Sequence, residues 1–280
     1  MGEPLRVADL FSGIGGFSLG LERTGGFETA FFCEQDKFCR KVLAKHWPGV
    51  PIYEDVRELT AARLRADGIT VDVITAGFPC QDISVAGKGA GIEGERSGLF
   101  YEIIRLVGDL RKAGQPPKYV VLENVAVILT RGLGEVLIGL ESVGYDAEWH
   151  CIPASHLGAP HRRDRWWNVA YPQGVGVQGR RASGQQKSTS YVGPELFVRC
   201  CPGSGTAIGQ PFEYMGLLAD GISTGLARYR WLAEPGVRRV AASIPYRSAR
   251  LKALGNSLIP AMPEIIGTAI LNREKYLEGR

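Results

Sequence analysis

Five short apolar runs, each stopping at a polar or glycine-rich turn, alternate with helical stretches over the first 125 residues. The runs span residues 6–11, 27–33, 50–56, 71–76 and 118–122, and helical patterns lie near residues 17–24, 36–46, 57–67 and 99–113. Such alternation predicts an α/β fold with a parallel sheet and right-handed crossovers. The carboxyl ends of the five strands then meet at one edge of the sheet, which is where open α/β sheets bind ligands.

The second half of the chain is less regular. Two further strands are expected at residues 145–153 and 166–170, and a final helix from Ala261 to about Tyr276 has the apolar spacing of a helix that packs on a sheet. Between them, residues 171 to about 225 are rich in Gly, Ser, Gln and scattered Arg, which predicts a loop-rich insertion or a small second domain. A length of 280 residues accommodates one large α/β domain, with or without such an addition.

Charge is unevenly distributed along the chain. Residues 1–150 hold 16 Lys and Arg against 21 Asp and Glu, a net charge of −5, whereas residues 151–252 hold 14 against 5, a net charge of +9. This asymmetry indicates a polyanionic partner, with nucleic acid the leading choice, although a solvated basic face would give the same pattern. Because the sequence has neither a run of 18 apolar residues nor a signal-peptide pattern, a cytoplasmic location without a membrane is expected.

The six cysteines do not have the spacing of metal ligands, and one of them is a candidate nucleophile. They show no Cys-x-x-Cys spacing and only four histidines accompany them, so no metal is expected. Cys80 follows the fourth apolar run, within Gly77-Phe78-Pro79-Cys80-Gln81, where Pro79 ends the run and directs the next side chain out of the sheet. A thiol at that place is a candidate nucleophile, although cysteine is also a common small buried hydrophobe.

Glycine is abundant after Cys80, at positions 87, 89, 91, 94 and 98. Glycine removes the side-chain restriction on the backbone, so a segment with this composition moves easily. Residues 84–98 therefore predict either a mobile lid that carries Lys88 and Arg96 or a merely flexible surface loop.

The turn after the first apolar run is also rich in glycine, in the stretch Ser12-Gly13-Ile14-Gly15-Gly16-Phe17-Ser18. A strand, a glycine turn and a helix in this order let a ligand approach the backbone and present free N–H groups. Ser18 stands where the dinucleotide fingerprint Gly-x-Gly-x-x-Gly needs its last glycine. Glu34, at the end of the second run, suits a ribose diol, or else caps the helix that starts near Asp36.

Three arginines stand between the last two expected strands, in Ala159-Pro160-His161-Arg162-Arg163-Asp164-Arg165. Strand alternation would place Arg163 and Arg165 on one face and Arg162 on the other. The planar guanidinium group suits carbonyl or phosphate oxygens, so these residues are candidates for substrate binding.

Taken together, the motifs resemble those of the DNA (cytosine-5) methyltransferase family, of prokaryotic or phage type. The resemblance covers roughly residues 5–170 and 229–271. It is carried by five motifs in the family's order: Asp9-Leu10-Phe11-Ser12-Gly13-Ile14-Gly15-Gly16, Gly77-Phe78-Pro79-Cys80-Gln81, Glu123-Asn124-Val125, the Arg163 and Arg165 pair, and Gly255-Asn256-Ser257. His161 replaces the usual Gln before the arginine pair, and Gln35 replaces a more usual aromatic or aliphatic residue.

The resemblance implies a Rossmann-like methyltransferase sheet that uses S-adenosylmethionine, with a small, loop-rich target-recognition region. Its implied domains are a catalytic domain at 1–170, a target-recognition region at 171–230 and a returning C-terminal segment at 231–280. The implied reaction methylates C5 of a flipped-out cytosine in double-stranded DNA, by a monomer and in the context of restriction-modification. Cys80 would add to C6 of the base, Glu123 would protonate N3, and Arg165, supported by Arg163, would hold O2 and phosphates.

The resemblance also assigns binding residues. The implied cofactor site comprises Phe11, Ile14, Gly16, Glu34, Gln35, Asp55, Val56, Pro79, Leu99 and Asn256. In it, Glu34 takes the ribose hydroxyls, Gln35 stacks, and Asp55 with Val56 takes adenine. The expected DNA contacts are Ser84, Lys88, Arg96 and Arg162.

Three other functions stay open. A tRNA cytosine-5 methyltransferase would share this catalytic domain, although the Cys-Phe-Thr signature of that branch does not follow the Glu-Asn-Val motif. A nicotinamide oxidoreductase would explain the glycine turn and Glu34 but not Cys80, Glu123 or the arginines. A catalytically silent DNA-binding homologue is disfavoured by the presence of both Cys80 and Glu123.

Overall fold

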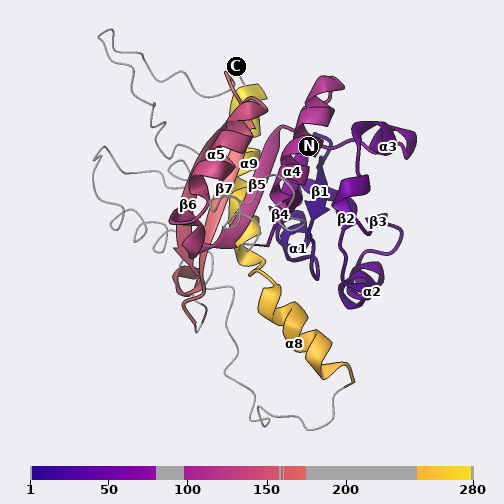
Figure 1. The fold of residues 1–280 in the computed structure, drawn as a ribbon, viewed down its shortest axis with the longest axis vertical. Coiled ribbons are helices and arrows are strands. Elements are labelled where there is room, and N and C mark those ends of the chain that lie inside the picture. Colours follow the sequence, from indigo (N-terminus) through magenta and orange to yellow (C-terminus); the bar gives the residue numbers. More distant parts are fainter. Residues whose placement is uncertain (1, 80–97, 158, 160, 175–244, 279–280) are drawn as a thin grey trace.

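The structure is a computed structural model that describes residues 2–79, 98–157, 159, 161–174 and 245–278. Its centre is a seven-stranded sheet with the order β3-β2-β1-β4-β5-β7-β6 (Figure 1). The strands are β1 (Leu5–Leu10), β2 (Phe27–Cys33), β3 (Ile52–Tyr53), β4 (Val73–Gly77), β5 (Tyr119–Val125), β6 (Tyr145–Pro153) and β7 (Asp164–Pro172). The first five are mutually parallel, and β7 is antiparallel to both β5 and β6.

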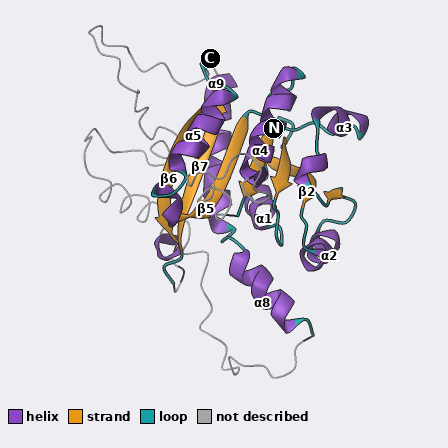
Figure 2. Cartoon of the chain, in the orientation of Figure 1, coloured by secondary structure: helices purple, strands orange, loops and turns teal. Residues whose placement is uncertain are grey.

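Helices cover both faces of the sheet (Figure 2). The described helices are α1 (Gly16–Glu22), α2 (Lys37–His46), α3 (Ala61–Ala66), α4 (Gly98–Lys112), α5 (Leu133–Ser142), α8 (Arg247–Asn256) and α9 (Ala261–Glu278), with short 3-10 turns η1 (Val56–Glu58), η4 (Ala126–Leu129) and η5 (Ala154–Leu157). One core lies between the sheet and α4 with α5, and a second lies between the sheet and α1 with α9.

Burial on both faces explains why the parallel strands are nearly continuous apolar runs. Along β4, Val73 faces the α1 and α9 side, whereas Ile74 and Ala76 face the α4 and α5 side. The same alternation recurs in β5, where Val121 and Leu122 face opposite cores. A strand that is covered on both faces has no solvated side on which to place polar residues. The expectation of a parallel α/β sheet is therefore confirmed.

The third expected strand is shorter than residues 50–56. It pairs with β2 only over Ile52 and Tyr53. After Tyr53 the chain leaves the sheet, because the Asp55 carboxylate accepts a hydrogen bond from the Arg57 N–H and starts the turn η1. The helix expected at 57–67 starts later, where Thr60 caps α3 through the Arg63 N–H.

Two described helices, α5 and α8, were not expected as separate elements. Helix α5 follows Gly132, which has a left-handed backbone (φ 142°) and makes no side-chain cap, so its start carries no polar capping signal. Helix α8 stands away from the sheet in Figure 1, which is why its sequence lacks a clear apolar stripe.

Helix α9 returns to the sheet beside α1. Its side chains Met262, Ile266 and Ile270 are buried in the second core, as its apolar spacing predicts. Among the described residues, one stretch, 247–278, is long and apolar enough to be considered for a membrane span, but the burial of α9 identifies it as a core helix. The expected glycine-rich lid and most of the expected target-recognition region fall in 80–97 and 175–244, outside the described residues, so those domain limits stay predictions.

The contact between α1 and α9 depends on Gly20. A Cβ atom at Gly20 would lie 2.2 Å from the Pro260 carbonyl oxygen, which is backbone and cannot rotate away. We expect Gly20→Ala to lower the free energy of unfolding by about 1–3 kcal/mol, the usual result of overpacking. Urea denaturation monitored by circular dichroism measures this change.

Gly134→Ala is the matched control. Gly134 is also helical, in α5, but a Cβ atom there meets nothing within 4 Å. Its replacement should leave stability unchanged or raise it by up to about 1 kcal/mol, the difference in helix propensity between Gly and Ala. Equal stability of the two variants would contradict the close packing of α1 on α9.

Candidate active site

The carboxyl ends of β4 and β5 form the centre of the site. Glu123 lies opposite Gly77 of β4 on one side and opposite Trp167 of β7 on the other. Arg165 lies two residues before Trp167, so its side chain points to the same face of the sheet as that of Glu123. The Arg165 Nε atom is 2.9 Å from Glu123 Oε1. A Cβ atom at Gly77 would be 3.3 Å from Glu123 Oε2, so the glycine leaves room for this carboxyl group.

Burial makes Glu123 a carboxyl group that holds a proton near neutral pH. Desolvation raises the pKa of Glu123 to about 7, against the opposing influence of the positive charges of Arg165 and Arg163. A carboxyl with a pKa near the working pH exchanges its proton readily, which is what general acid–base catalysis requires. The expected acid at the end of the fifth strand thus has the chemistry of a proton donor.

Arg163 lies just before β7, with a left-handed backbone (φ 37°). Strand alternation therefore does not set its direction, and the argument that placed it with Arg165 on that basis was wrong. Its Nη2 donates to the carbonyl oxygens of Gly255 and Ser257, which flank Asn256 at the end of α8. Its Nε is buried and has no acceptor among the described residues. Arg163 thus joins the arginine-bearing end of β7 to the segment that carries the expected cofactor residue Asn256.

Asn124 belongs to the Glu-Asn-Val motif, but no role was predicted for it from the sequence. Its Nδ2 donates to the Phe78 carbonyl oxygen at 3.0 Å, and its side chain is almost fully buried. This bond joins the end of β5 to the chain just before Pro79, and so fixes the exit of β4 relative to Glu123. The available signal was its place in the turn after an apolar run, but its acceptor is a main-chain atom 46 residues away. Cys80 itself lies outside the described residues.

A second part of the site is the glycine turn after β1. Gly13 and Gly15 have left-handed backbones, and the Gly13 N–H donates to Glu34 Oε2 at 2.7 Å. The other oxygen of Glu34 accepts from the Asp36 N–H, also at 2.7 Å. Asp36 itself caps α2 by accepting from two backbone N–H groups. Glu34 is therefore not the helix cap, and it holds the glycine turn beside the end of β2.

Asp9, in β1 just before the glycine turn, holds the neighbouring elements together. Its fully buried carboxyl group accepts hydrogen bonds from the Ser18 N–H and Oγ and from Thr75 Oγ1. Burial raises the pKa of Asp9 to about 7. Ser18, which replaces the last glycine of the dinucleotide fingerprint, thus bonds α1 to Asp9 at the end of β1, and Thr75 bonds β4 to the same carboxyl group.

Carboxylates gather at the ends of β1, β2 and β3. Burial raises the pKa of the Cys33 thiol to about 12, and the negative charges of Asp55, Glu34, Glu58 and Asp9 act in the same direction. Asp55 is 2.6 Å from Arg57 Nη2, and this hydrogen-bonded ion pair holds the pKa of Asp55 below its ordinary value. This end of the sheet is acidic, whereas the end at Glu123 is lined by arginines.

A family model for C-5 cytosine-specific DNA methylases matches residues 5–196, which include both parts of the site. The chain belongs to this family. One curated relative of this chain is "Type II methyltransferase M2.BsuMI" of Bacillus subtilis, which is 39% identical over 165 residues. The match covers 58% of this chain and 40% of the relative. "Type II methyltransferase M.CviJI" of Paramecium bursaria Chlorella virus IL3A is 35% identical over 167 residues, covering 59% and 42%. The chain thus spans less than half the length of these two relatives.

A solved structure agrees with the fold of this chain. A variant of Spodoptera frugiperda DNMT2 superposes with a TM-score of 0.61 at 16% sequence identity, covering 95% of this chain and 99% of that one. At this identity the likeness shows the fold alone. The expected α/β, Rossmann-like fold is therefore confirmed.

The remaining expected cofactor residues lie in or just after the turns that follow β1 to β4, except Leu99 near the start of α4 and Asn256 at the end of α8. Phe11 and Leu99 are half-buried against the first core, and Val56 is buried in it. Gly16 starts α1 and packs closely against Leu258, whose Cδ1 would be 2.9 Å from a Cβ atom added at Gly16. Ile14 is half-buried, whereas Gln35, Pro79 and Asn256 are exposed. These residues lie at the same edge of the sheet, and their role in binding stays a prediction.

Of the expected DNA contacts, only Arg162 is described, and its side chain is exposed beside the arginine pair. Ser84, Lys88 and Arg96 lie outside the described residues. Within the described part of the chain, no three His, Cys, Asp or Glu side chains are grouped as a metal site requires.

The positive charge of Arg165 lowers the pKa of Glu123 against the effect of burial. Its removal should therefore change that pKa measurably. Arg165 is the group that most lowers the pKa of Glu123, and Arg165→Met removes its positive charge. We therefore expect the pKa of Glu123 to rise above about 7. Carbon-13 NMR of labelled glutamate carboxyl groups, titrated with pH, measures this change. Arg162→Met is the control, because Arg162 is exposed. A pKa that stayed the same or fell in Arg165→Met would contradict the described pairing.

Proposed function

We propose that this chain is the catalytic part of a DNA (cytosine-5) methyltransferase, which moves a methyl group from S-adenosylmethionine to C5 of a cytosine in double-stranded DNA. The observation that carries the proposal is the buried Glu123, paired to Arg165 and joined through Asn124 to the strand end that leads to Cys80. Family membership and relatives named Type II methyltransferases support it. Such relatives also favour a place in restriction-modification.

The cofactor end of the site fits S-adenosylmethionine. Two left-handed glycines allow close approach, Glu34 stands at the end of β2, and the surrounding carboxylates favour a ligand with positively charged ammonium and sulfonium groups. The same carboxylates repel a pyrophosphate, which disfavours the nicotinamide alternative. When bound, S-adenosylmethionine supplies an electrophilic methyl group.

The base end of the site prepares cytosine to accept that group. C5 of cytosine is a weak nucleophile until a thiolate adds to C6, and Cys80 is the proposed thiol. As the bond between sulfur and C6 forms, an electron pair moves to N3, and the Glu123 carboxyl donates its proton there. As C5 takes the methyl group, N3 returns its proton to the Glu123 carboxylate. Loss of the C5 proton to a solvent base then expels the Cys80 thiolate and restores the aromatic ring. A proton donor with a pKa near 7 suits this step because it is partly protonated at the working pH.

The arginines have distinct proposed roles. Arg165 holds the Glu123 carboxyl in place through Nε and leaves a guanidinium edge for the O2 atom of the base, where negative charge develops. The buried Nε of Arg163, which has no acceptor in the described part of the chain, is a second donor at this edge. Neither C6 nor N3 is reachable in a stacked duplex, so the cytosine must be flipped out of the helix. The net charge of +9 over residues 151–252 suits phosphate contacts, which position the protein without reading the base sequence.

Methyl transfer from labelled S-adenosylmethionine tests the proposal. Unmethylated duplex DNA should gain label, and Cys80→Ser should abolish transfer and trapping on 5-fluorocytosine DNA. Glu123→Gln keeps the shape of the side chain but has no acidic proton, so its rate should fall by about 10²–10⁴-fold, the usual contribution of general acid catalysis. Label that enters tRNA but not DNA would favour the tRNA alternative. Cofactor binding without transfer to either would favour the silent homologue.

The pKa of Glu123 also predicts a pH profile. The free protein needs the protonated carboxyl, so kcat/KM should fall as pH rises through about 7. The Cys80 thiol must instead lose its proton to act as a nucleophile, so kcat/KM should rise with pH as the thiolate forms, and the two requirements together give a bell-shaped curve. Steady-state rates measured in buffers of constant ionic strength provide the profile. A kcat/KM that keeps rising well into the alkaline range would exclude Glu123 as the acid.

A further inference from the structure

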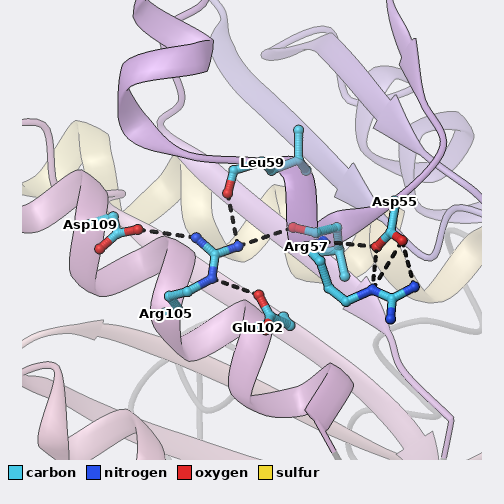
Figure 3. A network of polar contacts seen from close by, with 7 residues as sticks. Asp55, Arg57, Leu59, Glu102, Arg105 and Asp109 are labelled. Atoms are coloured by element: carbon cyan, nitrogen blue, oxygen red, sulfur yellow. Dashed lines mark hydrogen bonds and ion pairs between the residues drawn. The ribbon is translucent and has the colours of Figure 1, made fainter. Parts of the chain in front are cut away.

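Arg105 lies in the middle of α4, and all three nitrogens of its guanidinium group make hydrogen bonds (Figure 3). One of them joins the helix to the turn η1 and to Leu59 after it. Its Nη2 donates to two main-chain carbonyl oxygens, those of Val56 at 3.1 Å and Leu59 at 2.8 Å. The rest of the group is held by carboxylates on its own helix, with Nε 2.6 Å from Glu102 and Nη1 3.1 Å from Asp109. Arg105 is therefore fixed on α4 and aimed at the segment that follows β3.

That segment needs such support because the sheet does not reach it. Strand β3 pairs with β2 only at Ile52 and Tyr53. Beyond that point, burial of the Val56 and Leu59 side chains fixes the depth of the turn in the core. Burial is non-directional and does not determine which way the peptide groups point. The Val56 carbonyl oxygen is held from two directions, by the Leu59 N–H within the turn and by Arg105, which alone of the two ties it to α4.

The bond to Val56 reaches Asp55 through one rigid peptide group. The Val56 carbonyl and the Arg57 N–H belong to the same planar unit, so fixing the oxygen fixes the direction of the N–H. That N–H donates to Asp55 Oδ1 at 2.9 Å. In Figure 3, Asp55 and Arg105 lie on the two sides of this turn. The Arg57 side chain also binds the Asp55 carboxylate directly, so Arg105 acts on the peptide from which both of these contacts with Asp55 start.

We propose that Arg105 is a positioning residue of the cofactor site, which orients Asp55 toward the adenine ring through the peptide between Val56 and Arg57. The inference rests on the proposed function and on the expected place of Asp55 beside adenine, where its carboxylate would accept a hydrogen bond from the adenine amino group. Helix α4 also carries Leu99 at its start, so Arg105 sets the spacing between two sides of the pocket. A planar fork with several donors is required, because a lysine provides a single point of attachment.

The test compares two ligands, S-adenosylhomocysteine and S-inosylhomocysteine, by isothermal titration calorimetry. The inosine compound lacks the amino group, so it makes no bond of this kind with Asp55. We expect Arg105→Ala and Arg105→Lys to weaken binding of S-adenosylhomocysteine by about tenfold, the order found when a hydrogen bond to a charged group is lost. Binding of S-inosylhomocysteine should change little. A merely structural role for Arg105 would weaken both ligands equally.

Arg111→Ala is the matched control. Arg111 lies on the same helix and donates in the same way to two main-chain carbonyl oxygens, those of Val143 and Gly144, which follow α5. Its loss should lower the melting temperature as that of Arg105 does, but leave the affinity for both ligands unchanged. Arg105→Lys keeps a positive charge beside Glu102 and Asp109, and so provides a folded variant if Arg105→Ala unfolds.

The outcomes separate this inference from the function on which it rests. If the unsubstituted protein binds neither ligand, the proposed function fails. If it binds S-adenosylhomocysteine more tightly than the inosine compound, and Arg105→Lys keeps that preference in full, the positioning role of Arg105 is overturned.

Discussion

The parallel pairing of β1 with β2 and with β4 is the constraint on which the rest of the site depends. It brings the ends of β1, β2 and β4 to one edge although they lie far apart in the sequence. The buried carboxyl group of Asp9 completes this junction, because it accepts hydrogen bonds from α1 through Ser18 and from β4 through Thr75. A buried polar group without partners is costly, so these bonds hold the glycine turn in a single arrangement.

The site divides into two electrostatic halves along this edge. Carboxylates surround the ends of β2 and β3, where a cationic cofactor is proposed, and arginines surround Glu123, where a base that gains negative charge is proposed. Glu123 lies at the arginine-lined end and yet retains a raised pKa, because burial outweighs the neighbouring positive charges. The balance between these two influences leaves the Glu123 carboxyl group able to donate a proton near neutral pH.

Much of the fold could be predicted because hydrophobic periodicity is a local property of the sequence. The run at 27–33 coincides with β2, and the run at 145–153 coincides with β6. Prediction failed where a single hydrogen bond ended an element, as at Asp55 after β3, or where a helix lacked a polar cap, as at Gly132 before α5. It also failed at Arg163, whose left-handed backbone places it outside the strand alternation that was applied to it.

The sequence by itself determined which groups are available: a glycine turn, acids at strand ends, an arginine pair and a thiol after Pro79. These follow from residue type and spacing, which need no tertiary information. Only the tertiary structure decided that Glu123 is buried beside Arg165, that Asn124 holds the Phe78 carbonyl, and that Arg105 holds the turn after Asp55. The physical reason is that two of these three contacts end on main-chain carbonyl oxygens. Every residue carries such an oxygen, so the residue type at the acceptor position does not reveal that it takes part in the contact.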